Sequence, residues 1–252
     1  MLIDVAALIA TIIVPSDRFI DPPALERSLA ALRKRSAEDG LMRALEQVIA
    51  ATRELFGASG AGLMMVDDQS ALAAVAATNE PGRLLEIRQQ EIGHGPCVDS
   101  LTFDQVVTTA DLAVEDRWPE LVPELPEQGV RAILGVPIHV DNVPVGSLNV
   151  YRDQPGEWDP SEVTALEAYA RLIESLLATA LQARHRGELA QQLQHALNHR
   201  VVIERAIGVI MARKNLGPVD AFNQLRRTAR SSERKVGDVA ADLLAQLPDT
   251  PA

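Results

Sequence analysis

The sequence lacks the residues that several classes of protein require. Its 252 residues include a single cysteine, Cys97, which excludes an internal disulfide and any zinc site built on several thiolates. No uncharged apolar run approaches the roughly 18 residues that a membrane-spanning helix needs. The nearest candidate, residues 1–14, is short, contains Asp4 and lacks the basic region of a signal peptide. We therefore expect a cytoplasmic protein with no membrane partner.

Sequence motifs of common enzymes are also missing. The chain has no GxxxxGK[ST] phosphate loop, no HExxH metal motif and no GxSxG nucleophile turn. The acidic pairs at 67–68 and 115–116 fall in predicted turns, where carboxylates are solvated. The sequence therefore predicts a protein that is not an enzyme, and a small-molecule enzyme is the least favoured alternative.

Charge is distributed unevenly along the chain. Hydrophobic residues make up 47%, which is typical of a packed protein, and the formal net charge is −11. Residues 1–188 carry 15 basic and 29 acidic side chains, whereas residues 189–252 carry 9 basic and 6 acidic ones. Because a net negative charge disfavours a polyanionic partner, only the C-terminal part suits a nucleic acid.

The first two-thirds of the chain predicts an α+β fold. An N-terminal helical arm over 1–37, split near Pro15, precedes a helix over 41–55 with apolar residues at spacings of three and four. The order is then hairpin, irregular middle, hairpin and helix, which indicates an antiparallel sheet flanked by helices. The expected strands are 61–66, 71–78, 105–109, 131–140 and 145–151.

A long helical segment follows. Asp159, Pro160 and Glu162 form a strong helix start, and no proline occurs from 161 to 215. Apolar residues then alternate at three and four, as a coiled coil requires. We expect a stalk over 160–198 that pairs two chains as a homodimer and, if continuous to 215, a rod of roughly 80 Å. Two antiparallel helices folded back at Gly187 are the alternative. The seam comprises Leu166, Tyr169, Ile173, Leu176, Ala180 and Ala183.

The C-terminal part predicts short helices with basic ends, running to 213, over 219–230 and over 236–247, before a tail at 248–252. Arginine and lysine can bind phosphates, and arginine also stacks on unpaired bases. Phe222 shares an apolar stripe with Leu225, so we expect it in a core and not on a base. The candidate RNA-binding residues are Arg213, Lys214, Arg226, Arg227, Arg230, Arg234 and Lys235.

The sequence resembles two known families, one after the other along the chain. Residues 38–182 resemble a GAF domain of the actinobacterial sensor type, and residues 189–247 resemble an ANTAR domain, a helical RNA-binding module. The GAF motifs are GHGPCV (93–98), ADL (110–112), RWP (117–119), GVRAILGVPI (129–138) and VGSLNVY (145–151). The ANTAR motifs are RVVIERAIGVIMAR (200–213), AF (221–222), LR (225–226), AR (229–230), RKV (234–236) and DVA (238–240).

The resemblance implies a mechanism. A signal-responsive regulator with a GAF sensor would bind paired hairpins in nascent RNA, so that the competing terminator stem does not form. The alternative is a GAF sensor whose helical output binds DNA or a protein partner. Two departures from the ANTAR pattern, Ile207 in place of a basic residue and Glu233 in place of an amide, lower the local positive potential.

The candidate sensor residues are His94, Cys97 and His139. Cys97 follows a glycine-rich loop that could expose a thiolate near His94 as a redox sensor, or it packs as a small hydrophobe. Haem ligation by His94 and His139 is disfavoured because no supporting partner is visible. No Asn-Lys pair occurs, so a cyclic nucleotide is disfavoured as well. The resemblance leaves a small-molecule ligand of the GAF domain open, and the signal unnamed.

Overall fold

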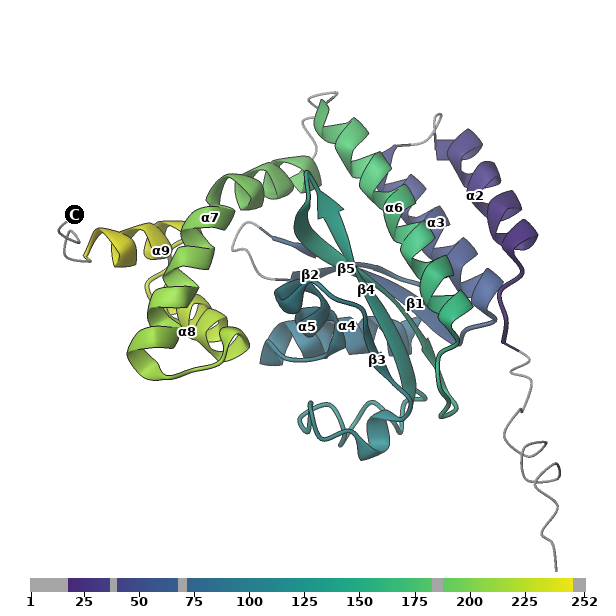
Figure 1. Cartoon of the computed structure of the whole chain (residues 1–252), viewed down its shortest axis with the longest axis horizontal. Helices are drawn as coiled ribbons and strands as arrows, with labels where there is room; N and C mark the ends of the chain where they lie inside the picture. The colour runs from purple at the N-terminus through teal and green to yellow at the C-terminus, as the bar shows by residue number, and fades with distance from the viewer. Residues whose placement is uncertain (1–17, 37–39, 68–71, 183–187, 247–252) are drawn as a thin grey trace, which may run out of the picture.

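The computed structural model describes residues 18–36, 40–67, 72–182 and 188–246. Within these ranges an antiparallel sheet of five strands in the order β2-β1-β5-β4-β3 forms the middle layer of the N-terminal domain. Helices α3 and α6 cover one face, with α2 packed against them, and α4 and α5 cover the other face (Figure 1). The predicted α+β class and antiparallel sheet are confirmed. The strands are β1 Gly60–Val66, β2 Leu72–Ala77, β3 Val107–Thr109, β4 Ala132–Val140 and β5 Val143–Arg152.

The two predicted hairpins are both present. β1 pairs with β2, and β4 pairs with β5, each in antiparallel register. The β4–β5 turn is shorter than the predicted 141–144, because Asp141 and Asn142 alone reverse the chain with φ of 51° and 62°. Positive φ at both positions is the geometry of a two-residue turn whose twist matches the strands. β1 is buried along its whole length because both faces of the sheet are covered.

The predicted irregular middle is wrong. It contains two helices, α4 over Glu80–Ile92 and α5 over Pro96–Phe103. Asn79 caps α4 by accepting a hydrogen bond from the Gly82 amide at 3.1 Å, and Gly93 ends it with a φ of +72°. These start and stop signals are legible in the sequence. The helical spacing of apolar residues is not visible in the sequence, because α4 places the polar residues Glu86 and Gln89 in the interior.

The three helices on the other face are α2 Pro22–Ser36, α3 Leu41–Phe56 and α6 Pro160–Gln182. The predicted start of α6 is confirmed: the Ser161 amide donates to Asp159 Oδ1 at 2.7 Å, and the Asp159 amide donates to Glu162 Oε2 at 2.9 Å. The Ser28 hydroxyl lies 2.6 Å from the Tyr169 hydroxyl, which joins α2 to α6. The second piece of the predicted arm is thus packed on the sensor, and the first lies outside the described residues.

The structure describes the expected stalk segment as two helices and not as one rod. α6 is followed by a separate helix, α7 (Glu188–Lys214), which runs in a different direction (Figure 1). Leu166, Tyr169 and Ile173 are fully buried inside the same chain, where α6 packs on α3 and β4. The spacing of three and four therefore reflects an intramolecular core, because a helix on a sheet needs the same apolar stripe as a coiled coil. Gly187 lies outside the described residues.

The C-terminal domain is all-α. α7 packs with α8 (Pro218–Ser231) and α9 (Val236–Ala245), which confirms the predicted helices; the 248–252 tail falls outside the described ranges. Phe222 and Leu225 lie in their shared core, as predicted. Ala206, Ala229 and Ala240 are fully buried, so these small side chains let the helices approach closely. The α7 residue Leu197 instead packs on the sensor core.

Candidate nucleic-acid interface and sensor sites

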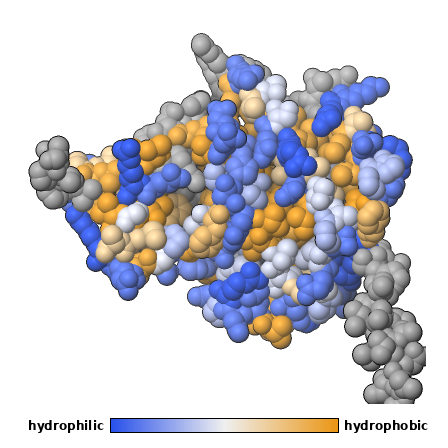
Figure 2. Space-filling view, viewed as in Figure 1, coloured by the Kyte–Doolittle hydropathy of each residue, from blue (hydrophilic) through white to orange (hydrophobic). Residues whose placement is uncertain are grey.

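Most of the predicted RNA-binding residues are exposed. Arg213 and Lys214 end α7, and the side chains of both are open to solvent. Arg227 and Arg230 are three residues apart on α8, so they share one exposed face. Arg234 is exposed but pairs with Asp242 at 2.6 Å, and Lys235 is half-buried. Hydrophilic residues gather along the outer, lower edge of this domain (Figure 2).

Arg226 does not lie with the other basic residues. Arg226 is only 7% exposed, and it lies on α8 within 3.5 Å of the Asn223 side chain. One turn earlier, Asn223 Nδ2 donates to the Gly93 carbonyl at 2.8 Å in a buried contact. Burial and the charge of Arg230 lower the pKa of Arg226. The negative charge of Asp67, directly after β1, opposes this shift. The structure therefore separates Arg226 from the exposed arginines, which residue spacing alone did not predict.

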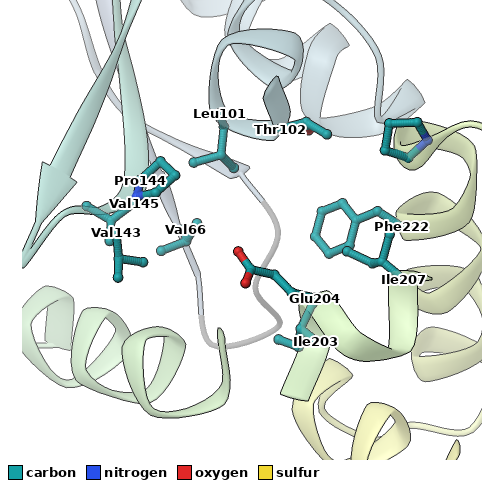
Figure 3. A pocket seen from close by; sticks show the side chains of 11 residues that line it. Val66, Leu101, Thr102, Val143, Pro144, Val145, Ile203, Glu204, Ile207 and Phe222 are labelled. Atoms are coloured by element: carbon teal, nitrogen blue, oxygen red, sulfur yellow. The ribbon is translucent and has the colours of Figure 1, made fainter. Parts of the chain in front are cut away.

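A cavity of about 180 Å³ lies between the two domains. The Glu204 carboxylate faces it from α7, opposite Val66 and Leu101 of the N-terminal domain (Figure 3). Ile207, one of the two departures from the ANTAR pattern, is part of its wall. Cavities with apolar walls and a few polar groups, placed between domains, suit small molecules.

A buried polar cluster lies between α4, α5 and β5. Gln89 Nε2 and Asn149 Nδ2 each lie 3.3 Å from Cys97 Sγ, and Asn149 Nδ2 also donates to Glu86 Oε1 at 2.7 Å. Glu86 Oε2 and Asn149 Oδ1 are buried and find no hydrogen-bond partner in the part of the chain that the structure describes. Sequence reasoning found Cys97 but missed Glu86 and Gln89, because no apolar period marks α4, and it missed Asn149, which lies on β5.

Of the two interpretations of Cys97, the structure contradicts the exposed thiolate. Cys97 has no exposed surface, and burial together with the nearby Glu86 raises the pKa of its thiol. Burial also raises the pKa of Glu86 to about 8, although the Asn149 hydrogen bond opposes the shift. Both groups are therefore protonated at neutral pH. The alternative, a packed and unreactive Cys97, describes what the structure shows.

The two candidate histidines lie in different places. His94 Nε2 is 3.4 Å from Asp220 Oδ1, on the boundary between the domains. His139 contacts Glu174 through Nδ1 at 3.1 Å and Asp104 through Nε2 at 2.6 Å. Burial opposes protonation of His139, but these two carboxylates outweigh it and raise its pKa. Among the described residues, no group of three His, Cys, Asp or Glu side chains is placed to hold a metal ion.

Comparison with known families identifies the two domains. The GAF domain family matches residues 40–178, which is more than half of the chain. The chain belongs to the GAF domain family. The ANTAR domain family matches residues 191–244, so the three C-terminal helices form an ANTAR domain. The resemblance inferred from the motifs is therefore confirmed, with the sensor first and a domain of RNA-binding type second.

Solved structures support the GAF fold. Free methionine-R-sulfoxide reductase from Neisseria meningitidis, in complex with its substrate, has a TM-score of 0.53 and 18% identity, covering 65% of this chain and 95% of its own. A GAF domain of a phosphoenolpyruvate-protein phosphotransferase from Coxiella burnetii has a TM-score of 0.53 and 19% identity, covering 64% and 95%.

The corresponding GAF domain from Acinetobacter has a TM-score of 0.52 and 12% identity, covering 63% of this chain and 96% of its own. At these identities the likeness concerns the fold alone. No protein of curated function matches the chain. None of the helices in the described ranges is long and apolar enough to cross a bilayer.

Proposed function

We propose that this protein is a cytoplasmic, signal-responsive regulator that binds paired hairpins in nascent RNA and promotes transcription antitermination. The observation that carries the proposal is the ANTAR domain, which presents Arg227 and Arg230 on one exposed face of α8. Guanidinium groups donate paired hydrogen bonds to phosphate oxygens and stack on unpaired bases in RNA loops. The positive balance of residues 189–252 supports binding there and not on the acidic sensor.

The GAF domain supplies the sensor in this proposal. A small-molecule signal has two candidate places, the buried cluster around Cys97 and the cavity between the domains. We do not propose an enzyme. A thiol nucleophile needs an accessible sulfur, and Cys97 is fully buried.

A homodimer remains part of the proposal and needs a surface other than the predicted seam. Leu166, Tyr169 and Ile173 are occupied inside the protomer. Two ANTAR domains in one particle would hold two hairpins at once and raise the avidity without new contacts. Light scattering at micromolar concentration gives the mass, and a monomer would contradict this part.

RNA binding is tested by comparing a two-hairpin RNA with duplex DNA. We expect the full chain to prefer the RNA, and the double variant Arg227→Ala/Arg230→Ala to lose about tenfold to hundredfold in affinity. The matched control, Arg33→Ala/Arg35→Ala, removes two exposed arginines from α2 and should change the affinity little. An equal loss of RNA affinity in both double variants would show that the effect comes from net charge and not from the α8 surface. Preference for DNA would favour the DNA-binding alternative.

A further inference from the structure

We propose that the GAF domain holds the ANTAR domain in a closed arrangement that hides Arg226 from RNA, so that docking on the sensor and binding of RNA compete. This inference rests on the proposed function, because it concerns how RNA binding is regulated. Three features carry it: the contact between Gly93 and Asn223, the burial of Arg226, and the exposure of the remaining α8 arginines.

The contact between Gly93 and Asn223 is closely fitted. Asn223 Nδ2 donates to the Gly93 carbonyl at 2.8 Å. A Cβ atom at Gly93 would lie 2.4 Å from Asn223 Oδ1, closer than real Cβ contacts come. Gly93 also has a φ of +72°, which side chains other than Asn and Asp rarely adopt. Glycine at 93 therefore allows both the turn after α4 and the close approach of α8.

The docking loop is held from the sensor side as well. The Gly93 amide donates to the Gln89 carbonyl at 2.9 Å, and Gln89 Oε1 accepts from the Cys97 amide at 2.7 Å. A Cβ atom at Gly95 would lie 2.5 Å from the Gln89 side chain. The loop that receives α8 is thus fixed between Gln89 and the start of α5, which places the Gly93 carbonyl in position for Asn223.

Docking removes one arginine from the surface that would meet RNA. Asn223 and Arg226 are three residues apart, so they share a face of α8, and that face is turned to the sensor. Asp67, directly after β1, attracts the charge of Arg226. Arg227 and Arg230 stay exposed. The closed arrangement therefore leaves weak, incomplete RNA contacts and withholds Arg226.

The size of the effect follows from the populations of the two arrangements. If the full set of RNA contacts forms only in the open arrangement, the apparent dissociation constant equals the intrinsic one divided by the open fraction. Losing a buried amide–carbonyl hydrogen bond, and leaving its acceptor unpaired, shifts such an equilibrium by about tenfold. Breaking the Gly93–Asn223 contact should therefore raise RNA affinity by about tenfold, if the closed form predominates.

The test compares two glycines that end helices in the same backbone conformation. Gly93→Asn places a side chain against Asn223, whereas Gly57→Asn adds one where no atom lies within 4 Å. Asparagine tolerates the left-handed conformation at both sites. In full-length protein, an arginine-specific dicarbonyl reagent followed by mass spectrometry reports whether Arg226 is accessible. Arg227, exposed in the closed arrangement, is the internal reference.

We expect Arg226 to be protected relative to Arg227 in the wild type and in Gly57→Asn, and reactive in Gly93→Asn. A two-hairpin RNA should bind Gly93→Asn about tenfold more tightly than the other two. Adding Arg226→Ala to Gly93→Asn should remove that gain. If Gly93→Asn does not fold, Asn223→Ala removes the donor from the α8 side and should expose Arg226 equally.

Three results would overturn the inference. Equal reactivity of Arg226 and Arg227 in the wild type would show that no closed arrangement predominates. Exposure of Arg226 without a gain in RNA affinity would show that docking does not compete with RNA, and would leave the proposed function standing. If none of the proteins binds RNA, while Arg226 is protected in the wild type and reactive in Gly93→Asn, the proposed function is refuted and the competition with it.

Discussion

Replacing Glu86 by Gln tests the buried polar cluster of the sensor. The pKa of Glu86 is raised from 4.5 to about 8 by burial, so the folded protein keeps a proton that the unfolded chain releases. Stability that depends on this proton is present at acid pH and is lost as the pH rises from 4.5 toward 8. One pKa unit corresponds to about 1.4 kcal/mol, so from about pH 5 to about pH 8 the loss is about 3 kcal/mol.

Glutamine matches the protonated carboxyl in shape and never ionises. The free energy of unfolding of Glu86→Gln, relative to wild type, should therefore increase by about 3 kcal/mol over the same pH range. Both tryptophans, Trp118 and Trp158, lie in the GAF domain, so their fluorescence follows its unfolding in urea. The control Glu91→Gln changes an exposed carboxylate of the same helix and should give a flat difference. If the difference in free energy of unfolding between Glu86→Gln and wild type does not change with pH, Glu86 is not a buried, protonated carboxyl.

Two further predictions concern the charged groups of the sensor. Arg152→Ala leaves the buried Glu162 without its ion-pair partner and should lower the free energy of unfolding by about 3–5 kcal/mol. Arg83→Ala, which breaks an exposed and solvent-screened pair with Glu80, should lower it much less. The raised pKa of His139 means that its stabilising contribution is complete below its ordinary value of 6.5 and is lost as the pH rises through the folded value. Urea unfolding should accordingly show the advantage of wild type over His139→Gln shrinking above about pH 6.5; a constant advantage would contradict the assignment.

The fold could be predicted where the spacing of apolar residues fits only a helix or only a strand. The 41–55 helix and the strands follow from their periodicity, because most of their inward positions are apolar, although β5 also buries Ser147 and Asn149. α4 could not be predicted in this way, since Glu86 and Gln89 occupy inward positions where an apolar residue is expected. Its signals were the cap at Asn79 and the glycine at 93, which give the ends of a helix but not its face.

The stalk and Arg226 show a second limit of sequence reasoning. Leu166, Tyr169 and Ile173 fit a coiled coil and the core of their own domain equally well, and only the position of the sheet decides between them. Arg226 and Arg227 are adjacent in the sequence, yet one is buried and the other is exposed. Composition identifies both as cations and contains no information on the docking of α8.

The central claim, regulation through RNA hairpins, is tested most directly by sequencing the RNA that is cross-linked to the full-length protein in cells. We expect enrichment of transcript segments that form two adjacent hairpins before a terminator, and loss of that enrichment in Arg227→Ala/Arg230→Ala. RNA recovered without such segments, or recovered equally with the double variant, would contradict it.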